Sequence, residues 1–259
     1  MTKYRFTMNF EKVIPDIHVV IFDLGGTLIY DRDSWPPFFR RADEALIQAL
    51  QNAGLKIEPA KFFHGYRGLL DLYYDRRGDL IEKEETTTAL LRELLEEQGT
   101  PNINNELIAT ALRAMYAVTQ SNWFPEEDAI PTLETLKARG FHLGLISNAA
   151  DDENTQTLID KGGFRPYLEF ILSSAAFGKR KPHPAIFRAA LDHFGVKASQ
   201  AVMVGDLMET DIFGAHQIGM SSIWITRRVA KKESGIKVEP DAEVKTLREI
   251  PGLLVIGDW

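Results

Sequence analysis

Six polar residues lie directly after apolar runs or in the loops between them, and together they could carry phosphoryl transfer. They are Asp23, Ser147, Asn148, Lys181, Asp206 and Asp211. Phosphoryl transfer needs a nucleophile, neutralisation of the phosphate charge and a fixed geometry. Asp23 can serve as an oxygen nucleophile that forms an aspartyl-phosphate. Lys181 can place a positive charge near both that nucleophile and the phosphoryl oxygens, so the pattern favours a phosphate site.

Asp23 and Asp206, two carboxylates that each follow a strand, would repel each other unless a cation lay between them. Hard oxygen ligands with room for water suit Mg²⁺, which would screen the nucleophile and stabilise developing charge. Ser147 and the backbone amides around Gly26 and Thr27 could donate hydrogen bonds to the phosphoryl oxygens. Glycine at positions 25 and 26 lets the main chain approach the ligand closely. We therefore expect a magnesium-dependent site.

Each of these residues also has an ordinary structural explanation. An aspartate after a strand usually caps a helix or forms a turn, and a Ser-Asn pair commonly begins a loop. Lys181 lies in a KRK cluster typical of a solvated surface. The combination favours the chemical interpretation, because polar groups follow three successive core strands in order along the chain.

Apolar runs and helical periodicity predict the elements that would bring these residues together. Buried strands are predicted at 18–23, 141–147, 168–174, 201–206 and 221–226, with helices at 130–139, 152–161, 184–194 and 209–217. This alternation is typical of an α/β fold, a Rossmann-like parallel sheet with helices on both faces. Such sheets bind ligands beyond the carboxyl ends of their strands. The run LLVI at 253–256 could add an edge strand or pack on the surface.

A different pattern fills residues 33–121, where we predict amphipathic helices and no strand. The helices cover 38–52, 59–76, 84–98 and 104–120, which indicates a small bundle. We interpret its aromatic residues as bundle core: Trp35, Phe62, Phe63, Tyr66, Tyr73 and Tyr74. Three arginines are assigned to a solvated helix face: Arg40, Arg41 and Arg67. We expect two domains, an α/β core (1–32 and 122–259) and the helical insert (33–121).

Composition and charge exclude several function classes. The 259-residue chain has a net charge of -7, which argues against nucleic acid or an anionic membrane as its partner. It contains no cysteine, so disulfides, thiolate catalysis and Cys-ligated zinc are excluded. No apolar stretch approaches the roughly 20 residues that cross a bilayer, and the N-terminal residues lack a signal-peptide pattern. We expect a soluble, cytoplasmic protein.

With these motifs in this order, the chain resembles the haloacid dehalogenase-like (HAD) hydrolase superfamily over nearly its whole length. Four stretches resemble the family motifs: FDLGGTL (22–28), LISNA (145–149), GKRKPHPAIF (178–187) and VGDLMETD (204–211). The helical insert resembles the C1-type cap of subfamily IA, which closes over the site and selects substrates. The resemblance implies a hydrolase that acts on a small phosphorylated metabolite.

The resemblance also implies a role for each motif residue. Asp23 would be the nucleophile, with Lys181 as its catalytic partner. The substrate-binding set would be Gly26, Thr27, Ser147, Asn148 and Lys181. Mg²⁺ would be held by Asp23, Asp206, Asp211 and the backbone carbonyl of Gly25.

Gly25 is the departure from the family pattern, because most of its phosphatases carry an aspartate there as general acid and base. That residue normally protonates the leaving oxygen and then activates water, a contribution of typically 10²–10⁴-fold. We therefore expect an Mg²⁺-dependent phosphatase, acting through an aspartyl-phosphate on Asp23, for substrates whose leaving group needs no proton. Acyl phosphates and aryl phosphates meet this condition.

Two other functions stay open. Gly25 favours a catalytically weak or inactive protein that binds a phosphometabolite and regulates, although retention of Asp23 and Lys181 argues against it. The other is phosphotransfer to an acceptor other than water, or C–P bond hydrolysis, whose Schiff-base lysine could be Lys56, Lys61 or Lys83. Dehalogenases of the family carry tyrosine at the position of Gly25 and tend to lack the complete fourth motif.

Overall fold

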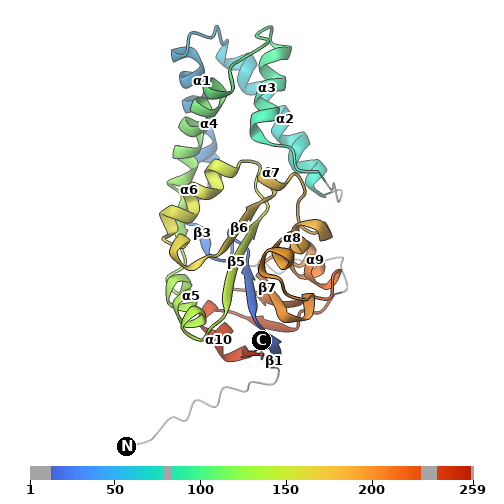
Figure 1. The fold of residues 1–259 in the computed structure, drawn as a ribbon. Coiled ribbons are helices and arrows are strands. Elements are labelled where there is room, and N and C mark those ends of the chain that lie inside the picture. Colours follow the sequence, from blue (N-terminus) through green and yellow to red (C-terminus); the bar gives the residue numbers. More distant parts are fainter. Residues whose placement is uncertain (1–12, 79–82, 229–237, 258–259) are drawn as a thin grey trace, which may run out of the picture.

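Figure 1 shows an α/β part with a bundle of helices above it, in a computed structural model that describes residues 13–78, 83–228 and 238–257. The α/β part is built on a six-stranded sheet in the order β6-β5-β2-β7-β8-β9, and every pair in it is parallel. The strands are β2 (Val19–Phe22), β5 (His142–Ser147), β6 (Phe170–Ser173), β7 (Ala201–Gly205), β8 (Ser221–Ile225) and β9 (Ala242–Val244). The predicted α/β fold with a parallel sheet is confirmed.

Helices cover both faces of this sheet, which explains why its central strands β2 and β7 are apolar throughout. In β2, Val20 and Phe22 pack into one hydrophobic core and Val19 and Ile21 into another, as the alternation of side chains along a strand requires. The first core includes α5 (Ala129–Ala138) and α6 (Asp152–Gly162), and the second includes α8 (Pro184–Phe194) and α9 (Phe213–His216). Two shorter helices complete the part, α7 (Ser174–Phe177) and α10 (Ile250–Leu253).

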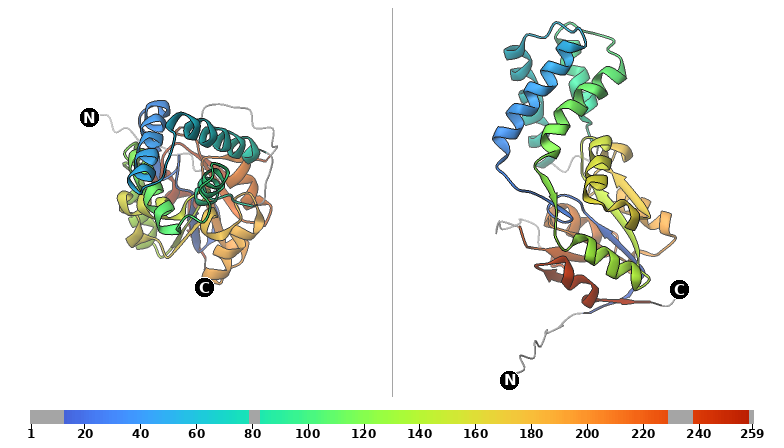
Figure 2. Two further views of the ribbon diagram at one scale, coloured as in Figure 1. Left: turned by 90° about the horizontal axis from the view of Figure 1, so that it is seen from above. Right: turned by 90° about the vertical axis from the view of Figure 1, so that its left-hand side faces the viewer.

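The inserted helices form a bundle with its own hydrophobic core beyond the carboxyl ends of the strands (Figure 2). They are α1 (Trp35–Asn52), α2 (Pro59–Gly78), α3 (Thr87–Glu97) and α4 (Asn105–Gln120). Helix α1 begins three residues earlier than predicted, at Trp35 rather than 38, because two prolines fit the first turn, where backbone donors have no partner. Thr86 and Asn104 cap α3 and α4 with their side-chain oxygens.

The aromatic residues of the bundle follow the prediction only in part. Phe62, Tyr66 and Tyr73 are buried, whereas Phe63 is 43% exposed, so its assignment to the core is wrong. Trp35 stacks on Phe39 and contacts Trp123, close to the junction with the α/β part. The side chain of Tyr74 lies outside the described residues.

A short antiparallel ribbon, absent from the prediction, joins the bundle to the α/β part. It pairs β3 (Ile29–Asp31) with β4 (Trp123–Pro125), and Asp31 lies opposite Trp123. Asn122 extends the pairing, since its side-chain amide accepts from Asp33 N at 2.9 Å and donates to Asp33 O at 2.8 Å. Strands of this length leave no alternating pattern in the sequence, and their pairing partner is distant along the chain.

Two further segments differ from the prediction. In place of a regular helix at 209–217, a π-helical turn, η3 (Met208–Ile212), leads into α9. The LLVI run forms β10 (Leu254–Ile256), which pairs with β1 (Ile14–Ile17) in a separate two-stranded sheet. It is therefore a strand, as one of the two predicted alternatives had it, but not an edge of the main sheet.

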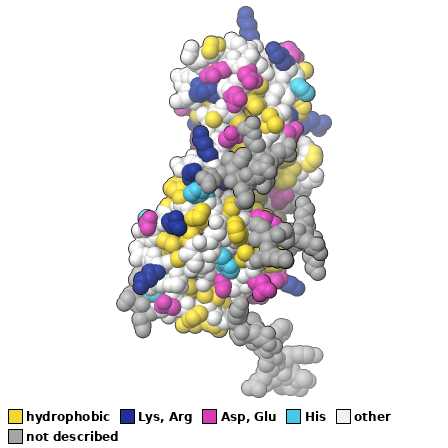
Figure 3. Space-filling view, turned by 90° about the vertical axis from the view of Figure 1, so that its right-hand side faces the viewer, with side chains coloured by type: hydrophobic (Ala, Val, Ile, Leu, Met, Phe, Trp, Pro, Cys, Tyr) yellow, Lys and Arg dark blue, Asp and Glu magenta, His cyan; other side chains and the backbone are white. Residues whose placement is uncertain are grey.

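The surface carries charges of both signs. On the face shown in Figure 3, acidic and basic side chains are interspersed over the bundle and the α/β part. Within the described ranges, no helix combines the length and the apolar character that crossing a bilayer requires.

Candidate active site

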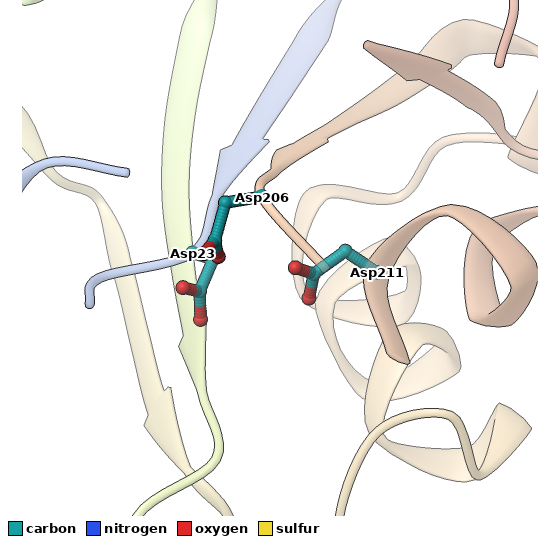
Figure 4. Close-up of side chains that lie close together, drawn as sticks. All are labelled: Asp23, Asp206 and Asp211. Carbon is teal, nitrogen blue, oxygen red and sulfur yellow. The ribbon is translucent and has the colours of Figure 1, made fainter. Parts of the chain in front are cut away.

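Asp23, Asp206 and Asp211 come together at the carboxyl end of the sheet (Figure 4). Asp23 follows β2 and Asp206 follows β7, and these two strands are paired neighbours. Asp211 reaches the same place from η3. One carboxylate oxygen from each residue lies within 4.8 Å of the other two. Three carboxylates this close repel one another unless protons or cations lie between them.

Lys181 places its ammonium group among these carboxylates. Its Nζ lies 2.6 Å from Asp23 Oδ1 and 2.7 Å from Asp211 Oδ1, and it donates to the carbonyl of Ile146 at 2.8 Å. The side chain is 1% exposed, so Lys181 does not belong to a solvated basic surface. Burial works to lower its pKa, but Asp211 and Asp23 raise the pKa of Lys181 overall. Its charge is thereby kept.

Lys181 does not balance the negative charge of all three carboxylates. Burial raises the pKa of the Asp23 carboxyl to about 6, although Lys181 opposes the shift. Burial also raises the pKa of Asp206 to about 8, and the charges of Asp23 and Asp211 add to it. Asp206 Oδ1 is buried and has no hydrogen-bond partner among the described residues. The cluster therefore accommodates a cation, and its oxygens are the ligand type that Mg²⁺ prefers.

Asn148 holds the loop that carries Lys181. Its side-chain amide donates to the carbonyl of Lys181 and accepts from Lys181 N, both at 2.8 Å. Since Asn148 follows β5, this reciprocal pair fixes the lysine loop to the end of a core strand. The contacts favour a positioning role for Asn148 alongside its predicted place in the substrate-binding set.

Two glycines let the carboxylates approach the backbone. Gly26 has φ +78°, and a Cβ there would overlap the Asp206 carboxylate. A Cβ on Gly205 would overlap Asp211 in the same way. Asp211 is further held by Leu207 N, which donates to its Oδ2 at 3.1 Å. Both of its oxygens are thus engaged, one by Lys181 and one by the backbone, which makes Asp211 a support for the lysine.

A cavity of about 510 Å³ opens beside Asp23; we call it the catalytic cavity. Its lining includes Gly25, Ser147, Asn148 and Lys181. Gly26 and Thr27 are not among its lining residues, and the fully buried Thr27 hydroxyl has no hydrogen-bond partner among the described residues.

Trp123 of the ribbon occupies the space beside Gly25. A Cβ on Gly25 would lie 3.5 Å from Cη2 of Trp123, an ordinary contact distance. Asp23 is the only carboxylic acid among the described lining residues of the catalytic cavity. Where a proton-donating side chain on residue 25 would lie, the cavity is therefore lined by the indole ring of Trp123.

A second cavity of about 280 Å³ lies under the bundle and was not predicted; we call it the aromatic pocket. Its rings are Phe39, Tyr66, Tyr73, Tyr116 and Trp123. It also contains a partly buried ion pair in which Arg67 Nε donates to Asp43 Oδ2 at 2.8 Å. Burial raises the pKa of Asp43, although Arg67 counteracts it. The assignment of Arg67 to a solvated helix face is wrong, because Asp43 draws it inward.

The bundle also touches the α/β part through Glu84, which lies just before α3 and is 4% exposed. Its carboxylate accepts from Tyr73 Oη at 2.7 Å and from Ser174 Oγ at 2.5 Å, and Arg180 Nε lies 3.9 Å away. Arg180 precedes Lys181 and lines the catalytic cavity. Glu84 therefore connects the bundle to the loop that carries the site lysine, and nothing in its sequence context marks it.

Comparison with known proteins identifies the family of the chain. Residues 17–219 match the family model of the haloacid dehalogenase-like hydrolases. The chain is 29% identical to glyceraldehyde 3-phosphate phosphatase of Pyrococcus furiosus over 93% of its own length and 92% of that protein. It is 32% identical to phosphoserine phosphatase of Thermus thermophilus, over 62% of either protein.

Solved structures of other proteins share this fold. The fold is similar to that of 2-haloacid dehalogenase from Pseudomonas syringae pv. Tomato DC3000, with a TM-score of 0.64 and 28% identity over 92% of this chain and 97% of that one. A HAD phosphatase from Thermococcus onnurineus shares the fold with a TM-score of 0.59 and 21% identity, over 91% of this chain and 97% of that one. With the family model covering most of its length, the chain belongs to the haloacid dehalogenase-like hydrolases.

Proposed function

We propose that this hydrolase is a Mg²⁺-dependent phosphatase that transfers a phosphoryl group to Asp23 and then to water. The observation that carries the proposal is the pairing of Asp23 with Lys181 at 2.6 Å, beside a buried Asp206 oxygen without a partner. A dehalogenase can use an aspartate nucleophile too, but it needs no second carboxylate facing a cation. The named relatives include phosphatases of small phosphorylated compounds, which supports the same substrate class here.

In the first step Asp23 attacks phosphorus, so that a bond from Asp23 to phosphorus forms and the bond to the leaving oxygen breaks. Lys181 stabilises the attacking carboxylate and the phosphoryl oxygens. Water then attacks phosphorus, which releases phosphate and restores the Asp23 carboxylate. Because residue 25 is a glycine, the leaving group departs as an anion, and substrates with stable anions are favoured.

The metal site would consist of Asp23, Asp206 and the backbone carbonyl of Gly25. Asp211 would support Lys181, with which it is paired. When bound, Mg²⁺ would supply positive charge that screens Asp23 from the phosphate. Asp206 fits this role because its Oδ1 is buried and lacks a partner among the described residues, and because its carboxylate lies against Gly26.

We further propose that residues 33–121 act as the cap of this enzyme and that 1–32 with 122–259 form its catalytic core. The aromatic pocket lies between bundle residues and the loop after β5, which supports a role of the bundle in substrate selection. C–P bond hydrolysis has less support, because Lys56, Lys61 and Lys83 are all exposed and none lines either cavity.

A phosphate-release assay with Mg²⁺ tests the function directly. We expect turnover of phenyl phosphate and acetyl phosphate by the wild-type protein. Asp23→Asn should reduce it by several orders of magnitude, as loss of a catalytic nucleophile does elsewhere. Acid quenching during turnover should trap phosphate on the peptide that contains Asp23.

Asp192→Asn is the matched control, because Asp192 is an exposed aspartate on α8 that lines neither cavity. Turnover that survives in Asp23→Asn would refute the nucleophile. Binding of phosphate compounds without turnover over hours would instead support a regulatory protein.

A further inference from the structure

The aromatic pocket adjoins the catalytic cavity. Trp123, Asn148, Ala149 and Asn154 line both of them. Asn148 and Ala149 belong to the loop after β5, directly beyond Ser147. A substrate whose phosphate lies beside Asp23 can therefore extend its leaving group under the bundle and into the aromatic pocket.

The pocket has the size and the walls to hold an aromatic ring. In other proteins an apolar cavity of about 150 Å³ holds benzene, and this one measures about 280 Å³. Besides its five rings, the wall includes Leu70, Leu90 and Met115. Aromatic rings in such a pocket pack edge to face or offset against one another.

Most polar groups of the pocket already have hydrogen-bond partners, either within the pocket or next to it. Arg67 is paired with Asp43, and the hydroxyls of Tyr116 and Thr87 are 2.7 Å apart. Tyr73 donates to Glu84 at 2.7 Å and Tyr66 to the Met115 sulfur at 3.2 Å. A hydroxylated or zwitterionic leaving group would need to break these pairs to be recognised, and buried polar groups left unpaired are costly. An aromatic ring needs none of them.

We propose that the aromatic pocket binds the leaving group of an aryl phosphate. The inference rests on the proposed phosphatase function and names its substrate class. Attack by Asp23 breaks the bond between phosphorus and the aryl oxygen, whose electron pair leaves with the phenolate, and the phenolate then takes a proton from water. Phenols have a pKa of about 10, so the phenolate is expelled without a proton donor at residue 25. A small acyl phosphate would leave the pocket unfilled.

Steady-state kinetics with a matched substrate series tests the pocket. We expect phenyl and 1-naphthyl phosphate to show kcat/KM values at least about tenfold above those of phosphoserine and glyceraldehyde 3-phosphate, because ring burial favours the former. Ala42→Leu fills the pocket from α1 and should raise KM for both aryl phosphates about tenfold, with a smaller change for acetyl phosphate.

Ala45→Leu is the control, because Ala45 lies on the same helix but lines neither cavity. Alkyl phosphates at or above the level of aryl phosphates would overturn the inference. So would an Ala42→Leu variant that raises KM equally for every substrate.

Calorimetry with the Asp23→Asn variant separates the inference from the function on which it rests. We expect phenyl phosphate to bind at least about tenfold more tightly than inorganic phosphate, and Ala42→Leu to remove this difference. If wild type turns over no phosphate compound while this binding pattern holds, the phosphatase function fails and the aromatic pocket stands. If turnover depends on Asp23 while phenyl phosphate binds no more tightly than phosphate, the inference about the pocket fails alone.

Discussion

The catalytic cavity is built from strand ends, whereas the aromatic pocket beside it is built mainly from helix faces. Beside the cavity, in the cluster of Asp23, Asp206 and Asp211, the charges are crowded and incompletely balanced, with an Asp206 oxygen that no described group satisfies. In the pocket most polar groups have hydrogen-bond partners, as in the pair of Asp43 and Arg67. The difference separates two tasks. Unsatisfied carboxylate charge attracts a metal cation, while polar groups that are already paired leave apolar surface to select a leaving group.

The largest expected effect comes from disturbing the charge cluster through Gly26. Gly26→Ala should lower kcat/KM by about 10²–10³-fold, the loss typical of one misplaced electrostatic group, because its Cβ would displace Asp206. Gly219→Ala is the control, since Gly219 has φ +76° and nothing within 4 Å of the added carbon. Both variants strain a left-handed position, but only Gly26→Ala should lose activity and Mg²⁺ affinity. Equal losses would mean that backbone strain, and not the carboxylate contact, sets the effect.

A second expectation concerns pH and the metal. Because the pKa of Asp206 is raised to about 8 and that of Asp23 to about 6, Mg²⁺ must displace protons at lower pH. The apparent Kd for Mg²⁺ should fall about tenfold per pH unit between pH 6 and 8, and calorimetry at several pH values measures it. Asp206→Asn should flatten the dependence. A Kd independent of pH would contradict the unbalanced charge of the cluster of Asp23, Asp206 and Asp211.

The same pKa shifts predict how the stability of the fold changes with pH. A carboxyl whose folded pKa lies above its unfolded value stabilises the fold fully below the unfolded pKa and loses this contribution as pH rises through the folded pKa. Without Mg²⁺, the part of the unfolding free energy due to Asp23 and Asp206 should therefore decline from about pH 4 to pH 8. The rise in Tm on adding Mg²⁺ should grow over the same range, as thermal unfolding in parallel buffers would show.

The smallest effect is expected in the pocket. Asp43→Asn removes the charge that balances Arg67, which then can receive an anionic ring substituent. The preference for 4-carboxyphenyl phosphate over phenyl phosphate should rise about tenfold, as for one added hydrogen bond to a charged group. Mg²⁺ affinity should not change, because Asp43 lines only the aromatic pocket. An unchanged preference would show that the ion pair does not determine what the pocket accepts.

The fold and the catalytic cavity could be predicted from the sequence better than the aromatic pocket, and the reason is physical. Strands β2 and β7 are continuous apolar runs, and Asp23 and Asp206 follow them directly, so sheet pairing brings the two carboxylates together by topology. Arg67 meets Asp43 in the pocket through the packing of helices, and Trp123, which lines both cavities, meets Gly25 through the ribbon. Such contacts depend on helix rotation, which amphipathic periodicity alone does not determine. The roles assigned to the individual site residues stay predictions.

The β3–β4 ribbon also governs what it costs to fold the chain around its inserted bundle. Asp31 and Trp123 lie opposite each other, so the insert leaves and re-enters the α/β part at one place. For a flexible loop, each doubling of length adds only about 0.6 kcal/mol to the entropic cost of closure. Because the ribbon ties the two ends of the insert together, β2 and β5 can pair at little extra entropic cost, and the bundle can assemble its own core as a closed loop.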